Sequence, residues 1–492
     1  MRITSVFLLA GALFACGKPA AAPSAPSANE TIARVTAGLR PAIVIKGEAP
    51  KKFTLAERMA LYKVPGVSIA LVDSGRIVWA RGFGLKEVGT ADSVGPNTLF
   101  QAASISKPVA ATAMLRLVEE GKLALDVPVN GYLKSWKVPA NKFTAKEMVT
   151  LRRIVAHHAG LTVHGFPGYA QGDSIPTVPQ ILDGTKPANT PAVRVDTTPG
   201  AVWSYSGGGI TVEQLAMTDV TGEPFPALLK RLVLDPIGMT NSGYDQPLPA
   251  TKRGQEAVGY KADGSMIVGR WHTYPEMAAA GLWTTPTDLL KWAMEITAAR
   301  AGKSTKVLSQ KMATEMLTVQ KAPSGLGPML HGSGRAFYFE HGGANEGYRC
   351  QVMYFPEIGR GAAVMTNSDA GSAVAQEILY ALAAEYHWPD YAPREIEPVV
   401  LDSAAVAALT GAYALPAALI GRAQGGELVI SAEGGKLFAA ATDVFQKSEI
   451  VALTPTKFLA PATGLEFAAI PGKKGGVAAI DIGGNKLPRK GK

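Results

Sequence analysis

Ser104 and Lys107 are the first residues whose types and spacing could perform catalysis. They form a Ser-x-x-Lys pair within residues 100–110. Residues three apart lie on one face of a helix, so the hydroxyl and the amine can meet. Residues 110–120 are good helix formers, which places Ser104 at the start of a buried helix, where a free backbone N–H can stabilise an oxyanion. A buried lysine can lose its proton near neutral pH and act as a base toward the serine.

Tyr205 is the second candidate. It precedes Ser206 and Gly207 at the point where a loop is expected to enter a helix. A phenol in a basic pocket beside Lys107 could be ionised and could transfer protons. The alternative is a packed tyrosine whose hydroxyl bonds to the backbone.

The third candidate is His341, which is followed by Gly342, Gly343 and Ala344. Two glycines on an edge strand allow a ligand or another backbone segment to approach closely. The imidazole could act there as a hydrogen-bond donor or as a cation. A purely structural histidine is the alternative.

His157, His158 and His164 raise the question of a metal site. Their spacing is not i, i+4 on a clear helix, and no acidic residue lies nearby in the sequence. We therefore expect packing at the end of a helix, with no metal and no other cofactor.

Composition narrows the class of protein. The chain has 492 residues, with 47% hydrophobic and 18% charged residues, enough for two or three domains with sizeable cores. The formal net charge is +9, but the basic residues are dispersed and are not interleaved with aromatic residues. We therefore expect no nucleic-acid partner. Cys350 lies in an apolar, strand-like run and is expected to be a buried small side chain.

The N-terminus resembles a targeting segment. Arg2 precedes an apolar run at residues 6–14, which is too short to span a membrane as a mature helix. Residues 13–16, Leu-Phe-Ala-Cys, resemble a bacterial lipoprotein box, with Cys16 as the lipidated residue. We predict a signal peptide over residues 1–16, a flexible tether over residues 17–30, and a periplasmic protein held at a membrane by lipid. Plain secretory cleavage is the alternative.

The order of expected elements indicates one α/β domain over residues 31–394. Residues 64–83 predict a hairpin around Ser74 and Gly75, and further strands are expected between residues 337 and 366. Helices fill the middle of the chain, including one over residues 144–157 with Thr144 and Glu147 as a capping box. Such an order predicts a sheet with strands from both ends of the chain and a mostly helical insert. The irregular residues 160–201 are expected to be functional.

Residues 395–492 predict a separate, small all-β domain, a sandwich or a barrel. The segments are short and are separated by turns rich in glycine. Strands are expected at residues 428–432, 436–441, 450–454, 457–460, 465–470 and 477–482.

Taken together, the motifs at Ser104–Lys107, Tyr205–Gly207 and His341–Gly343 resemble the three motifs of penicillin-recognising serine hydrolases. The chain is similar to the branch that holds class C β-lactamases, family VIII carboxylesterases and D-Ala-D-Ala carboxypeptidases. Further matching stretches lie at residues 65–70, 125–129, 157–161, 280–288 and 364–367. The resemblance covers about residues 50–386. It implies an antiparallel sheet of the β-lactamase/transpeptidase type, an α/β (α+β) fold.

The resemblance also implies roles. Ser104 would be the acylated nucleophile, Lys107 would take its proton, and Tyr205 would relay a proton to the leaving group, although either Lys107 or Tyr205 could be the general base. The backbone N–H groups of Ser104 and Ala344 would form the oxyanion hole, with His341, Gly342 and Gly343 beside the substrate.

Two positions depart from the family pattern. The second motif usually ends in asparagine, which holds an amide of the substrate, but here the residue is Gly207. The third motif of true class C β-lactamases opens with lysine, but here it opens with His341. We therefore expect a serine hydrolase that acts on ester or peptide-type amide substrates in the cell envelope. A class C-type β-lactamase or a D-Ala-D-Ala carboxypeptidase is the alternative.

Two other hypotheses remain. Ser206 could be the nucleophile, because Ser204-x-Ser206-x-Gly208 is a degenerate nucleophile elbow, although its first glycine is missing and no strand precedes it. A different class is a non-catalytic protein that binds a peptidoglycan fragment or acts as a sensor. The sequence does not predict an oligomeric state.

Overall fold

The computed structural model describes residues 27–49, 51–416, 425–441, 445–461, 464–472 and 476–491. Cys16 and the predicted signal peptide lie outside the described residues. Helix α1 (Ala28–Thr36) is capped by Ser27, whose side chain forms a capping box with Glu30. The tether predicted to extend to residue 30 is therefore wrong for its last three residues, which are helical.

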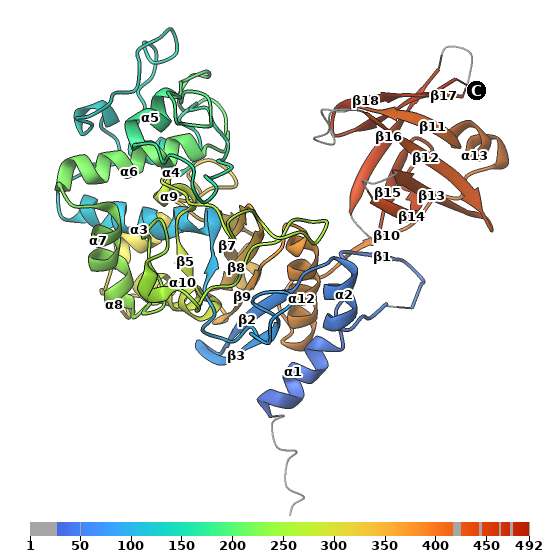
Figure 1. The fold of residues 1–492 in the computed structure, drawn as a ribbon, viewed down its shortest axis with the longest axis horizontal. Helices are drawn as coiled ribbons and strands as arrows, with labels where there is room; N and C mark the ends of the chain where they lie inside the picture. Colours follow the sequence, from blue (N-terminus) through green and yellow to red (C-terminus); the bar gives the residue numbers. More distant parts are fainter. Residues whose placement is uncertain are drawn as a thin grey trace, which may run out of the picture.

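An antiparallel sheet of six strands is the centre of the larger part of the molecule (Figure 1). The β2–β3 hairpin turns through Ser74 and Gly75, which both have positive φ, as a two-residue hairpin turn requires. Strand β9 lies between β2 and β8, so the sheet takes strands from both ends of the chain, as predicted. The order across the sheet is β3 (Arg76–Gly84), β2 (Gly66–Asp73), β9 (Arg360–Thr366), β8 (Tyr348–Phe355), β7 (Tyr338–Asn345) and β6 (Met329–His331).

Both faces of this sheet are covered by helices. Side chains alternate along β2, so that Ile69 and Leu71 belong to one core and Ala70 and Val72 to the other. Helix α12 packs on the first face with α1 and α2, and α10 packs on the second. Their bounds are α2 (Leu55–Leu61), α10 (Pro286–Arg300) and α12 (Gly371–Glu385).

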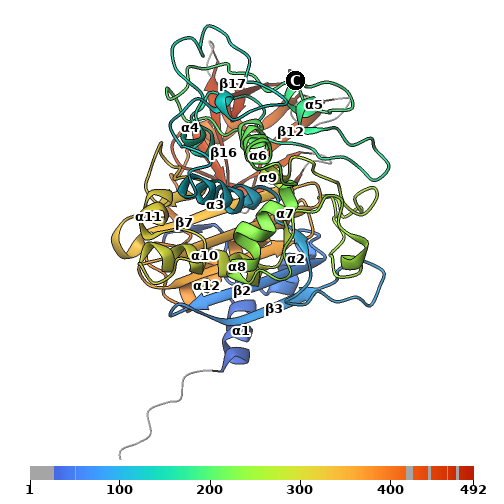
Figure 2. The same cartoon turned by 90° about the vertical axis from the view of Figure 1, so that its left-hand side faces the viewer.

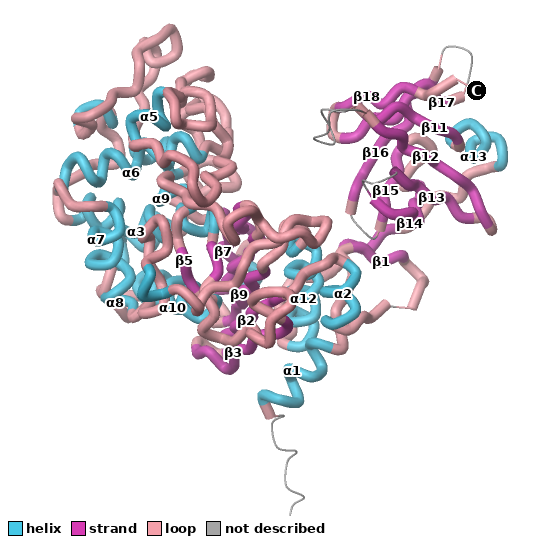
Figure 3. The backbone as a smooth tube through the Cα atoms, in the orientation of Figure 1, coloured by secondary structure: helices cyan, strands magenta, loops and turns pink. Residues whose placement is uncertain are grey.

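The predicted helical insert lies beyond α10. Figure 2 shows α3 and α6 above the sheet, and Figure 3 shows long loops around α5 and α6. A short pair of strands, β4 (Phe100–Gln101) and β5 (Trp283–Thr284), leads into this part. Its helices are η1 (Ala103–Ile105), α3 (Ser106–Glu119), η2 (Val129–Gly131), α4 (Leu151–Val155), α5 (Val178–Asp183), α6 (Gly207–Thr221), α7 (Phe225–Leu229), the π-helical η3 (Lys230–Leu234), α8 (Asp235–Ile237), η4 (Ala250–Lys252), α9 (Met277–Ala280) and α11 (Gln310–Met316). The turn η5 (Gly334–Ala336) connects β6 to β7.

The helix predicted over residues 144–157 is wrong in extent. Only α4 forms, and its N-cap is Thr150. The Asn141 side chain accepts bonds from the backbone N–H groups of Phe143 and Thr144, at 2.9 and 3.2 Å, and so closes a turn there. Such local bonds compete with helix formation. In addition, Thr150 forms a β-bridge with Pro128, so the segment before α4 is extended.

The C-terminal part is an antiparallel barrel. Each strand pairs with the next, and a bridge between Tyr413 and Arg489 joins the first strand to the end of the last. The predicted all-β domain is thus confirmed, and it is a barrel. Helix α13 and the first and last strands of the barrel were not predicted. The elements are α13 (Ser403–Leu409), β11 (Gly411–Leu415), β12 (Gly426–Glu433), β13 (Lys436–Ala441), β14 (Phe445–Ala452), β15 (Lys457–Ala460), β16 (Leu465–Pro471), β17 (Val477–Ile482) and β18 (Asn485–Pro488).

A two-stranded parallel ribbon joins the two parts. It consists of β1 (Ile43–Ile45) and β10 (Arg394–Ile396), and its residues Ile43 and Ile396 pack with Leu459 of the barrel. Among the described residues, none of the helices has the length and apolar content needed to cross a bilayer.

Candidate active site

Ser104 lies in the turn η1, between strand β4 and helix α3. The preceding residue, Ala103, has φ +49°, a left-handed conformation that is uncommon outside glycine. Helix α3 behind the turn is almost wholly buried, but Ser104 is partly exposed. The turn therefore presents the hydroxyl group at the surface of a rigid core.

Lys107 meets Ser104 as the spacing predicts, with its Nζ 2.9 Å from the serine Oγ. The Nζ also donates to the carbonyl oxygen of Ala279 in α9 at 2.7 Å. The side chain is buried, and burial lowers the pKa of Lys107 to about 7, although nearby Glu213 acts in the opposite direction. A substantial fraction of the amine is therefore unprotonated at neutral pH, as predicted, and can accept a proton.

Tyr205 lies immediately before the N-cap of α6. Its side chain hydrogen-bonds to Ser104, and Nζ of Lys107 lies 5.0 Å from the centre of its ring. Burial raises the pKa of Tyr205 above its ordinary value of 10, and the hydrogen bond with Ser104 offsets only part of this effect. The predicted ionised phenol is therefore wrong: Tyr205 keeps its proton, because burial disfavours the charged form.

The third motif lies on β7, along an edge. Strand β6 pairs with β7 only up to Glu340, so the strand from His341 onward has a neighbour on one side only, namely β8. A Cβ on Gly343 would lie 2.2 Å from the carbonyl oxygen of Ala102, so this glycine lets β7 approach the turn that carries Ser104. Ala344, whose N–H was assigned to the oxyanion hole, follows on the same edge and is exposed.

His341 is buried beside Lys107 and is not a cation. Burial lowers its pKa to about 4, and the charge of Lys107 acts in the same direction. Its Nδ1 lies 2.6 Å from the Gly342 carbonyl oxygen, so Nδ1 carries the proton and donates it in a hydrogen bond. Of the two roles predicted for His341, hydrogen-bond donor or cation, the ring therefore fills the first, and the second is wrong. The neutral ring offers no positive charge to a substrate carboxylate.

Gly207 is the first residue of α6, and its surroundings account for the missing asparagine. A Cβ there would lie 3.0 Å from the carbonyl oxygen of His164 and 3.1 Å from the ring of Phe166. The N–H of Gly207 also donates to the His164 carbonyl at 3.0 Å. The segment that contains His164 therefore occupies the space that an asparagine side chain would need.

The described residues show no metal site at His157, His158 and His164. Two of them flank Tyr205: the ring centre of His157 lies 4.3 Å from that of the phenol, and His164 lies at 4.8 Å. Nδ1 of His157 accepts the Ser206 N–H at 3.2 Å, and His158 contacts the carbonyl of Ala156 instead. Across the described ranges, histidine, cysteine, aspartate and glutamate do not cluster in a group of three that could hold a metal.

Ser206, the alternative nucleophile, serves as the N-cap of α6. Its Oγ accepts the Gly209 N–H at 2.8 Å and donates to the Thr162 carbonyl at 2.8 Å. The side chain is buried. Because both hydrogen-bonding roles are filled by backbone groups, this geometry argues against the nucleophile elbow. Cys350 is also buried, as predicted, with its Sγ 3.2 Å from the carbonyl oxygen of Gln101.

Two supporting residues of α6 were not predicted. Glu213 is fully buried near Lys107, neither of its oxygens has a hydrogen-bond partner among the described residues, and burial raises its pKa to about 8. Gln214 bonds to the Pro275 carbonyl at 3.0 Å and to the Ala278 N–H at 2.9 Å, which holds α9 and its lysine-binding carbonyl in place. The available signal was a polar pair inside the apolar run of residues 210–217.

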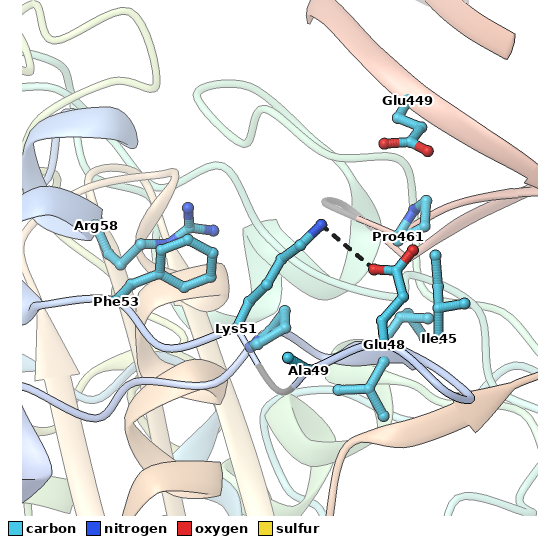
Figure 4. Close-up of a pocket in the computed structure, with 11 residues that line it drawn as sticks. Ile45, Glu48, Ala49, Lys51, Phe53, Arg58, Glu449 and Pro461 are labelled. Carbon is cyan, nitrogen blue, oxygen red and sulfur yellow. Dashed lines mark ion pairs between the residues drawn. The ribbon is translucent and has the colours of Figure 1, made fainter. Parts of the chain in front are cut away.

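A pocket of about 220 Å³ lies elsewhere, between the ribbon strand β1 and the barrel (Figure 4). Its charged residues are already paired: Lys51 with Glu48 at 3.7 Å, Arg58 with Glu377 at 2.5 Å, and Glu449 with Lys436 at 2.8 Å. Its lining, taken from the described residues, contains no serine, cysteine or histidine. The chemistry of the molecule is therefore best sought at Ser104.

Comparison with known proteins agrees with this geometry. The family model described as Beta-lactamase matches residues 54–385. The chain is 27% identical over 252 residues to the putative penicillin-binding protein PbpX of Bacillus subtilis, which covers 50% of this chain and 57% of PbpX. It is 28% identical over 191 residues to esterase EstB of Burkholderia gladioli, which covers 37% of this chain and 47% of EstB. The chain thus spans about half the length of these curated relatives.

A solved structure shares the fold over a larger part of the chain. The octameric penicillin-binding protein homologue from Pyrococcus abyssi superposes with a TM-score of 0.57, and the alignment covers 88% of this chain and 98% of that one. The identity is 21%, so this similarity concerns the fold alone.

Proposed function

The chain belongs to the β-lactamase family, and on this premise we propose that it is a serine hydrolase that forms an acyl-enzyme at Ser104. The observation that carries the proposal is the pair of Ser104 and Lys107. Their Oγ and Nζ atoms are 2.9 Å apart, and the pKa of the buried lysine is lowered to about 7. A serine hydroxyl is a weak nucleophile until a nearby base removes its proton.

In the proposed mechanism, Lys107 takes the proton of Ser104 as Oγ attacks the carbonyl carbon of the substrate. Tyr205 is the general acid, because its phenol is protonated and bonds to Ser104. It passes a proton toward the leaving group, and Lys107 replaces that proton. The N–H groups of Ser104 and Ala344 stabilise the oxyanion, an effect that is typically worth about 10²–10³-fold in rate. Water then attacks the acyl-enzyme and regenerates the serine.

We propose ester or peptide-type amide substrates over β-lactams. A β-lactam carries a carboxylate, and the neutral His341 offers this group no charge. An ester without a carboxylate needs no such charge, so the neutral His341 weakens β-lactam binding more than ester binding. The similarity to EstB supports the same choice.

We also propose that the protein acts in the periplasm, held to a membrane by lipid on Cys16. The support is the lipoprotein-like box at residues 13–16. The proposed domain boundaries are residues 31–394 for the hydrolase and 395–492 for the barrel. The second boundary falls in strand β10, within the ribbon that joins the two parts.

The test is hydrolysis of p-nitrophenyl acetate beside the β-lactam nitrocefin, with the wild-type protein and Ser104→Ala. We expect ester turnover that is lost in the variant and little cleavage of nitrocefin. Ester turnover that persists in Ser104→Ala would exclude this nucleophile. Fast nitrocefin cleavage would contradict the proposed substrate class, and binding of peptidoglycan fragments without any turnover would favour the non-catalytic hypothesis.

A further inference from the structure

Residues 162–166 form a segment that is built onto the N-terminus of α6 beside Tyr205. Three successive carbonyl groups of the segment accept bonds from α6 and its cap: Thr162 from Ser206 Oγ at 2.8 Å, Val163 from the Gly208 N–H at 2.9 Å, and His164 from the Gly207 N–H at 3.0 Å. This ladder fixes the segment against the residues that follow the tyrosine.

Glycines make this close approach possible. A Cβ on Gly208 would lie 2.5 Å from the Thr162 carbonyl oxygen, and a Cβ on Gly207 would meet both the His164 carbonyl and the Phe166 ring. Residue 207 of the second motif therefore lacks a side chain at the position where the backbone of residues 162–166 approaches α6. At this wall of the site, the backbone segment of residues 162–166 therefore takes the place of a side chain at residue 207.

Val163 shows that the segment is held in a specific conformation. Its φ is +66°, a left-handed value that is a genuine outlier for a β-branched residue. Strain of this kind costs about 1–3 kcal/mol and persists only where surrounding contacts impose it, often at functional sites. Here the imposed conformation places the next residue, His164, at the surface beside Tyr205.

The His164 ring is in position to meet a substrate. It is exposed, and its centre lies 4.8 Å from that of Tyr205, whose hydroxyl bonds to Ser104. Two half-buried aromatic side chains lie nearby: the ring of Phe166 approaches Gly207, and the ring centre of Trp203 lies 6.4 Å from that of Tyr205. An imidazole can both donate and accept a hydrogen bond, as the amide of an asparagine can.

We propose that His164 binds the substrate in place of the second-motif asparagine, and that the substrate carries an uncharged amide next to its scissile carbonyl group. The inference rests on the proposed function and narrows it to N-acylated amino-acid esters or amides. The neighbouring aromatic rings would pack against the hydrocarbon part of the same acyl group.

The experiment compares two esters of equal chain length, N-acetylglycine p-nitrophenyl ester and p-nitrophenyl pentanoate, which lacks the amide. His164→Ala should lower kcat/KM for the N-acetylglycine ester about five- to tenfold, mainly through KM, since one net hydrogen bond is lost. The pentanoate should change less than about twofold. His164→Asn should restore most of the selectivity, because its side chain is again an amide. His387→Ala, at an exposed histidine on the other side of the sheet, is the matched control and should leave both esters unchanged.

An equal loss on both esters, or no loss on either, would overturn the role of His164 and would leave the proposed function standing if the wild type turns over the pentanoate. A wild type that hydrolyses neither ester would overturn the proposed function, and this inference with it. Melting temperatures of the variants within about 2 °C of wild type would show that the fold is intact.

Discussion

Replacement of Gly343 by alanine tests whether contact between β7 and the nucleophile turn sets the geometry of the site. The added Cβ would lie 2.2 Å from the Ala102 carbonyl oxygen, 3.1 Å from its carbon and 3.3 Å from the Ala103 Cβ. These atoms belong mainly to the backbone and cannot rotate away. Strand β7 and the turn must therefore separate by about 1 Å before the methyl group fits.

That separation should damage catalysis more than folding. A displacement of about 1 Å between reacting groups can cost about 10²-fold in rate, and overpacking of a buried site costs about 1–3 kcal/mol in the free energy of unfolding. We expect kcat/KM for p-nitrophenyl acetate to fall about 10²-fold in Gly343→Ala, with the protein still folded at 25 °C. The assay is steady-state hydrolysis beside thermal unfolding of the same samples.

Gly342→Ala is the matched control, one residue away in the same motif. Its Cβ would meet Oε1 of Gln351 at 2.9 Å, the end of a flexible side chain that can move aside. We expect activity within about threefold of wild type. If Gly343→Ala kept more than a third of wild-type activity, or if both variants lost activity equally, the reasoning about β7 and the turn would be refuted.

The pH dependence of kcat/KM should follow Lys107. Its pKa is about 7 and the unprotonated amine is the active form, so activity should rise with pH through about 7 and then level off; a flat profile from about pH 5 to 9 would count against a lysine base. Because burial raises the pKa of Glu213 to about 8, this carboxyl group is mostly uncharged where Lys107 titrates, so Glu213→Gln should leave this limb near pH 7, and a large shift to lower pH would show that Glu213 is charged there. Arg58→Met should lower the free energy of unfolding by about 3–5 kcal/mol in urea titrations, because it leaves the buried carboxylate of Glu377 without its partner at 2.5 Å. Arg34→Met, which breaks the more exposed pair with Glu385, should cost much less than Arg58→Met, and equal costs for the two variants would contradict this comparison.

The sequence predicted the sheet, the barrel and the meeting of the motifs because these depend on strong local patterns. Two runs rich in β-branched residues around Ser74 and Gly75 predict β2 and β3, and a three-residue spacing is enough to place Ser104 beside Lys107. The helix over residues 144–157 was predicted too long because Thr144 and Glu147 form a capping pattern. The turn at Asn141 competes with that pattern. That turn and the bridge to Pro128 depend on contacts that no local pattern contains.

The charge states at the site were harder to predict for a similar reason. An ionised Tyr205 and a cationic His341 were among the alternatives inferred from residue type, but both side chains are neutral because distant segments bury them. The place of His164 was equally hidden, since the sequence shows Gly207 as a loss and only the fold brings residues 162–166 into the vacated space. The sequence does show Glu213 as a carboxyl group in an apolar helix, but its proximity to Lys107 depends on how α3 and α6 pack.

The most direct test of the central claim is to find the residue that becomes acylated. The wild-type protein should be treated with a fluorophosphonate probe, and the labelled peptide identified by mass spectrometry. The account predicts one adduct, on Ser104, that forms more slowly in Lys107→Ala and is absent in Ser104→Ala. A label on Ser206, or one that persists in Ser104→Ala, would contradict it.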